Sequence, residues 1–132
     1  MSRRATLWLA LLSAAALAVP AAEAAPAKSG HNECFLSSDW DGWSAPGDSD
    51  FIYLRVRMHD IWRLDLTPGT HVHKDPGYFL VNRVRGSNWL CSPLDFDLTL
   101  TDHHGFSEPL IVTKVRKLTP AEIAAIPKKQ LP

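Results

Sequence analysis

Two histidines that lie two residues apart are the side chains of this sequence best suited to bind a metal ion. His71 and His73 occupy the segment THVHK, between two turns that each contain Pro and Gly. On an extended segment both imidazoles point to the same side, so their ring nitrogens could bind one Zn²⁺ or Cu²⁺. The turn formed by Asp102, His103 and His104 could supply further ligands if it lies at the same end of the domain.

A solvated polar loop is the alternative interpretation of this segment, and the residues favour it. Lys74 follows His73 directly and repels a cation, and the sequence has neither an H-x-x-x-H pair nor a cysteine ligand set. His71 and His73 therefore remain candidate ligands of a weak transition-metal site only. We expect no resident cofactor.

Charged side chains could support two further kinds of chemistry. Asp95 and Asp97 could act as a carboxylate pair in acid–base catalysis. They lie on the polar side of a predicted strand, where Lys114 and Arg116 are plausible partners. A basic stripe could bind an anionic ligand such as a lipid head group or a polysaccharide; its members are Arg55, Arg57, Arg63, Arg83 and Arg85. We expect Asp65 and the Asp95–Asp97 face to neutralise it.

Motifs of known enzymes are missing from the sequence. It has no G-x-S-x-G nucleophile elbow, no P-loop, no G-x-G-x-x-G fingerprint and no Cys-His nucleophile arrangement. A hydrolase with an unrecognised site is the remaining catalytic alternative.

The N-terminal residues predict export. Two arginines precede an apolar run over residues 7–19, and A-E-A at residues 22–24 forms a cleavage signal. We therefore assign residues 1–24 to a signal peptide and residues 25–33 to a flexible leader. The mature protein is expected in the periplasm or outside the cell. The apolar run is too short for a transmembrane helix, so we expect no stable membrane insertion after cleavage.

Cysteine content and charge bound the mature chain further. Cys34 and Cys91 are the only cysteines, and in an oxidising compartment they predict one disulfide bond. A reactive thiol is the alternative, but no C-x-x-C pair supports it. After loss of residues 1–24 the chain has one more acidic than basic residue, so we expect no nucleic-acid partner. The expected partner is an unidentified component of the envelope.

Alternating apolar and polar residues predict strands between residues 34 and 118. The predicted strands are 34–37, 51–58 and 61–66 as a hairpin, 78–84, 89–91, 94–101 and 110–118. Between the first two, Trp40 and Trp43 lie in a Gly-, Pro- and Asp-rich segment that we interpret as a loop. Their rings could stack on a sugar or a partner, but tryptophans more often cover the edge of a core.

Charge pairing selects a register for the hairpin. Placing Met58 opposite Trp62 keeps the apolar residues on one face and sets Arg55 opposite Asp65. A slip of two residues sets Arg55 opposite Arg63, which like charges disfavour. We therefore predict the first register, with a three-residue turn at 59–61.

The last segment, residues 119–132, predicts a short helix and a solvated tail. Thr119 is a good N-cap, Pro120 suits the first helical position, and Glu122 can complete a capping box. Ile123 and Ile126 would dock the helix on the sheet. Short strands without βαβ alternation predict a mainly β fold, either a small antiparallel β-sandwich or a partly open barrel with one short C-terminal helix.

Four pieces of sequence, in this order, resemble a known family. They are Cys34, IYLRVRMHDIWRLDL, LVNRVRGSNWLCSPLDFDLTLTD and LIVTKVRKLTPAEIAAIPKK. Over about residues 34–129 the chain resembles a family of small exported proteobacterial proteins catalogued only as a domain of unknown function. The resemblance implies a class of exported domain and no activity.

The chain departs from this family in its cysteines. Members often carry two more, one in a Cys-Pro turn after the first hairpin and one in the last strand, where this chain has PGTH at 68–71 and PLI at 109–111. If the missing two normally bond to each other, the resemblance implies that Cys34 and Cys91 are partners. It leaves the local structure of residues 67–77 open.

These observations together favour a non-catalytic function. We expect residues 34–118 to form a β-domain that serves as a binding or structural module for an unknown ligand. The alternatives are a weak metal-binding protein that uses the His-x-His loop and the unrecognised hydrolase.

Overall fold

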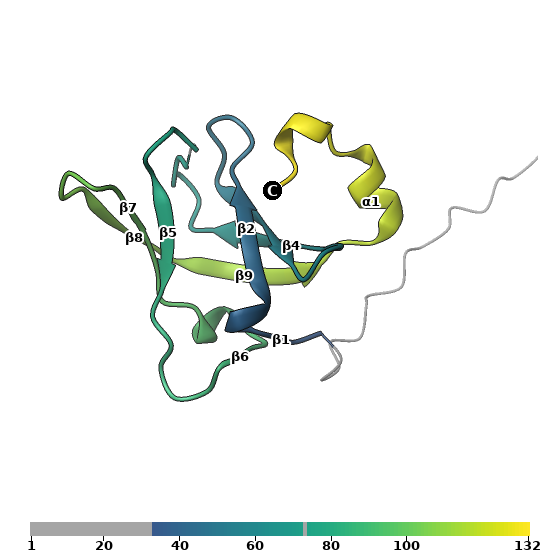
Figure 1. Cartoon of the computed structure of the whole chain (residues 1–132), viewed down its shortest axis with the longest axis horizontal. Helices are drawn as coiled ribbons and strands as arrows, with labels where there is room; N and C mark the ends of the chain where they lie inside the picture. Colours follow the sequence, from purple (N-terminus) through teal and green to yellow (C-terminus); the bar gives the residue numbers. More distant parts are fainter. Residues whose placement is uncertain (1–32, 73) are drawn as a thin grey trace, which may run out of the picture.

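The structure is a computed structural model that describes residues 33–72 and 74–132. The predicted signal peptide and all but the last residue of the predicted leader lie outside the described residues. The described chain forms short strands, one α-helix and three 3-10 helices (Figure 1). In chain order they are β1 Phe35–Leu36, η1 Ser37–Asp39, β2 Trp40–Ser44, β3 Phe51–Val56, β4 Asp60–Leu66, β5 Phe79–Asn82, β6 Trp89–Leu90, η2 Pro93–Asp95, β7 Leu98–Thr101, β8 Ser107–Leu110, β9 Val112–Lys117, α1 Pro120–Ala125 and η3 Lys128–Gln130.

The strands form three antiparallel sheets. The largest has the order β2-β3-β4-β9, the second has the order β5-β7-β8, and β1 pairs with β6 in the third. The two larger sheets enclose the core, and α1 lies at one end (Figure 1). The predicted mainly β fold, a small antiparallel sandwich with one short C-terminal helix, is confirmed. No helix of the described residues is long and apolar enough to cross a membrane.

One run of chain belongs to both large sheets. Ile111 alone separates β8 from β9, and its carbonyl accepts a hydrogen bond from Thr67 N–H at 3.0 Å. We predicted a single last strand over residues 110–118 and missed β8, whose Ser-Glu-Pro start has no apolar alternation. Pro109 is tolerated there because β8 is an edge strand. At the other ends of the two sheets lie β2 and β5, each with one unpaired side.

The apolar residues predicted for the hairpin form the centre of the core. Ile52, Leu54 and Leu64 are fully buried, and Phe35 packs against Trp62 with ring centroids 4.8 Å apart. Each such side chain contributes roughly 1.5–3 kcal/mol through removal from water. The second sheet contributes the buried residues Leu98, Leu100 and Leu110.

The hairpin register that we predicted is wrong. Leu54 lies opposite Trp62 and Val56 opposite Asp60, so the three-residue turn is at 57–59 rather than 59–61. Met58 is at the tip of this turn and is 79% exposed. Apart from Met58, both registers place the same apolar residues on the core face, so alternation could not separate them. Arg57, the first residue of this turn, adopts a left-handed conformation with a φ of 57°.

The charge pair used to choose that register is also wrong. Arg55 Nε donates to Asp41 Oδ1 at 2.8 Å, and Asp65 instead accepts from Arg63 at 2.6 Å. Asp41 belongs to β2, a strand that we had interpreted as a loop. The partner of Arg55 therefore comes from a strand that the pairing argument did not include.

The predicted strand over residues 94–101 is shorter in the structure. It begins at Leu98, and residues 93–95 form η2, on which Leu94 is 94% exposed. The Asp95 carboxylate accepts the N–H groups of Cys91 and Ser92 at 3.0 and 2.7 Å. Both bonds lower the pKa of Asp95, and the bond from Cys91 has the larger effect. Asp95 thus caps a turn.

The cross-strand partners predicted for the two aspartates are not the observed ones. Asp97 pairs with Arg85 at 2.7 Å, and Arg116 pairs with Glu122 at 2.6 Å. Lys114 lies opposite Asp65 in the β4–β9 register. The reason is the strand order, since β7 pairs with β5 and β8 and not with β9.

The helix and the disulfide are confirmed, but the tail is not fully solvated as predicted, because Leu131 packs against the domain and the Pro132 carbonyl accepts from Arg55 at 2.7 Å. Thr119 caps α1 by accepting the N–H of Glu122, and the Glu122 carboxylate accepts the N–H of Thr119. Ile123 and Ile126 pack against a small second cluster centred on Tyr53, Ile61 and Leu118. Cys34 and Cys91 form a disulfide next to the β1–β6 pair.

Candidate functional site

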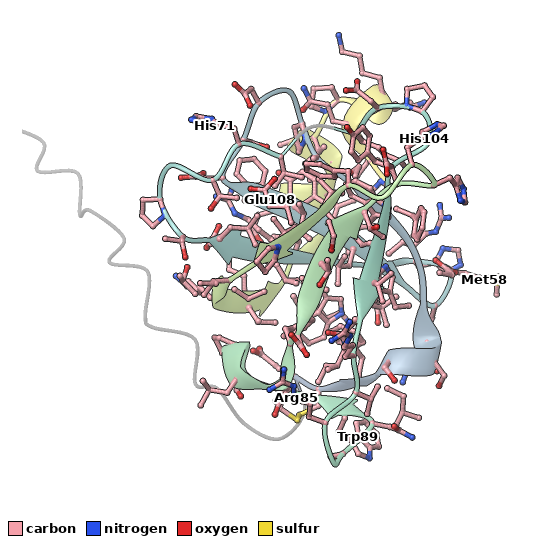
Figure 2. All side chains as sticks on the ribbon, turned by 90° about the vertical axis from the view of Figure 1, so that its left-hand side faces the viewer. Met58, His71, Arg85, Trp89, His104 and Glu108 are labelled. Atoms are coloured by element: carbon pink, nitrogen blue, oxygen red, sulfur yellow. A yellow bond between two sulfur atoms is a disulfide. The ribbon has the colours of Figure 1, made fainter. Side chains whose placement is uncertain are left out.

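The histidine loop does not form a complete metal site among the described residues. His71 is exposed, and its Nδ1 lies 3.5 Å from a carboxylate oxygen of Asp48. His73 is outside the described residues, so the His71–His73 pair stays a prediction. Figure 2 shows His71 and His104 on opposite sides of the molecule. Among residues 33–72 and 74–132, no group of three or more His, Cys, Asp or Glu side chains could hold a metal ion.

The second histidine turn has a structural role that its geometry explains. The Asp102 carboxylate accepts the N–H groups of His104 and Phe106, both at 2.8 Å, which closes the β7–β8 turn. The His103 ring lies 5.0 Å from the ring of Phe79. These contacts account for the turn without a metal ion.

Most of the predicted basic stripe is neutralised, as expected. The ion pairs are Arg55–Asp41, Arg57–Asp39, Arg63–Asp65 and Arg85–Asp97. Two of the four acidic partners, Asp39 and Asp41, were not among those we predicted. Arg83 makes no ion pair with a described residue. The stripe therefore leaves one unneutralised guanidinium, beside the end of β5.

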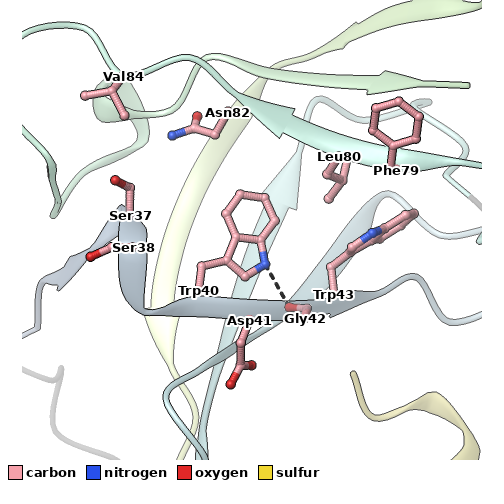
Figure 3. A pocket seen from close by; sticks show the side chains of 10 residues that line it. All are labelled: Ser37, Ser38, Trp40, Asp41, Gly42, Trp43, Phe79, Leu80, Asn82 and Val84. Carbon is pink, nitrogen blue, oxygen red and sulfur yellow. Dashed lines mark hydrogen bonds between the residues drawn. The ribbon is translucent and has the colours of Figure 1, made fainter.

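A groove between β2 and β5 is a feature that the sequence did not reveal. It has a volume of about 480 Å³ (Figure 3). Its lining residues are Ser37, Ser38, Trp40, Asp41, Gly42 and Trp43 on one side and Phe79, Leu80, Asn82 and Val84 on the other. The groove thus lies at the open side of the sandwich, away from the β8–β9 connection.

A β-bulge in β2 produces the aromatic side of this groove. Trp40 lies opposite Val56 and Trp43 opposite Leu54, with a register shift between Trp40 and Gly42. The extra residue brings two tryptophans that are three apart onto the core face. A Cβ at Gly42 would lie 2.9 Å from the Arg55 guanidinium, so a larger residue there would displace the end of that side chain.

The two tryptophans are held in different ways. Trp43 is 9% exposed and packs in the core, and its carbonyl accepts Lys74 Nζ at 2.7 Å. Trp40 is half-buried, and its indole N–H donates to the Gly42 carbonyl at 2.8 Å (Figure 3). Both cover the edge of the core, as the sequence predicted. Trp40 also presents ring surface to the groove.

Asn82 supplies an unused hydrogen-bond donor on the other side. Its Oδ1 accepts the N–H of Asp97 at 2.9 Å, which fixes the orientation of the amide. Its Nδ2 is buried and has no hydrogen-bond partner among the described residues. A buried donor without a partner costs about 1–3 kcal/mol. A ligand oxygen that displaced the atoms covering Nδ2 would remove that cost.

The open side of β5 also exposes backbone groups. Bonded and non-bonded pairs alternate along antiparallel strands, and the bond from Arg83 N–H to the Asp97 carbonyl at 3.1 Å marks a bonded pair. Val81 therefore bonds to β7 as well. The N–H and C=O groups of Leu80 and Asn82 point away from β7, to the side where the groove lies.

Sequence reasoning missed this site for two reasons. The bulge breaks the period of two in β2, and the two sides of the groove are some forty residues apart in the chain. One signal was present. Trp40-Asp41-Gly42-Trp43 places two large aromatic residues three apart around a glycine, a pattern compatible with a bulged strand.

Comparison with known proteins identifies no relative. No protein-family model, no curated protein and no solved structure matches the chain at a significant level. The resemblance drawn from the sequence stays a prediction, and any function must be argued from the groove itself.

Proposed function

We propose that this chain is an exported, non-catalytic binding module whose ligand occupies the groove between β2 and β5. The observation that supports this most directly is the pairing of an aromatic side with a buried, unpartnered donor. Trp40 offers ring surface on β2, and Asn82 Nδ2 offers an unused hydrogen bond on β5. Ligand sites commonly combine an apolar lining with a few fixed polar groups in this way.

The chemistry of the lining favours binding over catalysis. Asp41 is the one ionisable side chain among the described residues that line the groove, and Arg55 holds its carboxylate at 2.8 Å. General acid–base catalysis needs a group that can exchange a proton with the substrate. The Asp41 carboxylate is already engaged in an ion pair with Arg55 and is poorly suited to that role.

Export is supported by the disulfide. Such bonds persist in oxidising compartments and are rare in a reducing cytosol. The Cys34–Cys91 bond joins the chain just before β1 to the chain just after β6. The disulfide therefore supports our proposal that the protein acts in the periplasm or outside the cell, with a partner or ligand in the envelope.

A fragment screen tests the proposed site. The folded protein would be screened by two-dimensional NMR against a chemically mixed fragment library, with the Trp40 indole and Asn82 side-chain amide signals as reporters. We expect fragments that carry a carbonyl or hydroxyl beside an apolar group to shift both signals. Asn82→Leu should remove the preference for the polar group, while Asn88→Leu, at an exposed position outside the groove, should not.

The outcome that overturns the proposal is equally specific. Fragments could gather instead at the hollow of about 570 Å³ beside α1, which is lined by residues such as His59, Leu118 and Ile123. Shifts confined to those residues, or none anywhere, would reject the groove as the binding site.

A further inference from the structure

The four edges of the two large sheets are not protected equally. Natural sheets block unwanted strand pairing with bulges, charges and prolines on their edges. β2 carries a bulge, and Lys74 occupies the outward carbonyl of Trp43. β8 carries Pro109. β9 carries Lys114, Arg116 and Lys117.

β5 has none of these protections. Its sequence is Phe-Leu-Val-Asn, with no charge, no proline and no register shift against β7. Phe79 and Val81 are 36% and 38% exposed on its outer face. No hydrogen bond from another described element covers the outward N–H and C=O groups of Leu80 and Asn82. An apolar edge with unpaired backbone groups is the template on which another strand can form.

We propose that the free edge of β5 binds an extended peptide segment of a partner protein, which adds to the three-stranded sheet as a fourth strand. This inference rests on the proposed function and names the chemical class of its ligand. Backbone bonds to Leu80 and Asn82 would provide affinity, and alternate side chains of the peptide would enter the groove. The bulged, charged edge of β2 forms the far wall and does not itself accept the strand.

The groove favours a peptide over a second copy of this chain. In a β5–β5 pairing of two copies, the side chains directed to the groove would be Leu80 and Asn82 of the second copy. Leu80 already packs against the core of its own chain, and Asn82 already bonds Asp97. Neither could fill a space of about 480 Å³ in the neighbour. A peptide brings inward side chains that have no other partner.

Charge selects the kind of peptide. Arg83 continues the outer row of β5 that contains Phe79 and Val81, and it is exposed with no ion pair among the described residues. Opposite charges directly across a strand pair are stabilising. The bound strand should therefore carry an acidic residue opposite Arg83 and apolar residues opposite Val81 and Phe79.

Peptide backbone methylation tests strand addition directly. Terminally blocked decapeptides from a random phage-displayed library would be selected on the folded protein and measured by calorimetry. Methylation of each backbone nitrogen in turn should weaken binding with a period of two, by about tenfold where the N–H bonds β5. The alternate positions serve as the matched control. Uniform loss, or no loss, along the peptide would overturn the proposal.

Variants of the protein test the place and the charge. Val81→Lys should weaken the selected peptide about tenfold or more, whereas Met58→Lys, at an exposed apolar residue of the β3–β4 turn, should not change it. Arg83→Glu should reverse the preference from acidic to basic residues at the facing position. Equal effects of the Val81 and Met58 changes, or an unchanged preference in Arg83→Glu, would contradict the assignment to β5.

The failure of this inference can be separated from failure of the proposed function. If fragments bind the groove but methylation of the selected peptides weakens binding without a period of two, strand addition is rejected and the proposed binding module is retained. Concentration-dependent dimerisation that Val81→Lys abolishes would identify a second copy as the occupant and overturn the peptide. Absence of both fragments and peptides from the groove would reject both.

Discussion

The β2 and β5 edges border the same groove but differ in nearly every property that governs strand pairing. β2 carries a bulge, two tryptophans packed toward the core, an Asp41–Arg55 ion pair and a lysine on its outward carbonyl. β5 carries exposed apolar side chains and outward backbone groups to which no other described residue bonds. One edge is therefore closed to further strands and the other open to them. The comparison shows that the protection of each edge depends on the residues of that strand. An unprotected edge can therefore indicate the strand that binds a partner.

Truncation of one large aromatic residue on each edge should give the largest difference. Trp43→Ala removes a buried core side chain and should lower the free energy of unfolding by about 3–5 kcal/mol. Phe79→Ala removes a side chain that is 36% exposed and should cost about 1 kcal/mol or less. Urea denaturation of the two variants measures both values. Equal costs would mean that the β5 edge is part of the core rather than an open surface.

Removal of the disulfide should have a comparable but slightly smaller effect and should act on both edges. The bond closes a chain segment with a sequence separation of 57 and should stabilise the fold by about 4 kcal/mol in the chain-entropy model. Cys34→Ser with Cys91→Ser should lower the urea midpoint accordingly. Mass analysis under non-reducing conditions provides the control, since the parent chain should lose two hydrogens relative to the reduced form.

Replacement of Lys74 should expose the β2 edge at a smaller cost in stability. Lys74→Ala removes the bond to the Trp43 carbonyl and should cost about 1 kcal/mol of stability. It also frees a backbone acceptor on β2, so sedimentation should detect more self-association than in the parent chain. Lys128→Ala, at an exposed lysine, is the matched control. No difference between the two variants would show that Lys74 does not protect the edge.

The smallest expected effect is that of acid on the C-terminal helix. The bond from Thr119 N–H and the contact with Arg116 lower the pKa of Glu122 from its usual 4.5 to about 2. Its stabilising contribution is therefore complete above about pH 4.5 and is lost as the pH falls toward 2. Glu122→Gln should flatten the pH dependence of the urea midpoint within that window. An identical acid profile in the variant would contradict this.

Residue pattern alone was enough to predict the buried faces and the helix. Alternation identified Leu54 and Leu64 as core residues, and Thr119 with Glu122 marked the start of α1 correctly. These features depend on neighbours within a few residues. The same alternation could not determine the hairpin register, because every even slip keeps the same residues inside.

The candidate site could not be predicted because it depends on contacts between distant segments. Arg55 on β3 pairs with Asp41 on β2, and the Gly- and Asp-rich sequence of β2 did not indicate a strand. The orientation of Asn82 depends on Asp97, fifteen residues later, and the groove beside it exists because β2 and β5 end two different sheets. Composition gives no information on which strands end a sheet. The unneutralised charge of Arg83 likewise emerges only once the other pairs are known.

The single-residue connection at Ile111 limits how the domain can respond to a ligand. β8 continues into β9 through one residue that is itself bonded to Thr67. This short connection joins the two sheets and prevents them from sliding past each other on that side. A bulky ligand must therefore be accommodated at the opposite side of the sandwich, where β2 and β5 can move apart. A larger ligand should therefore change the angle between the two larger sheets and leave the strands themselves intact.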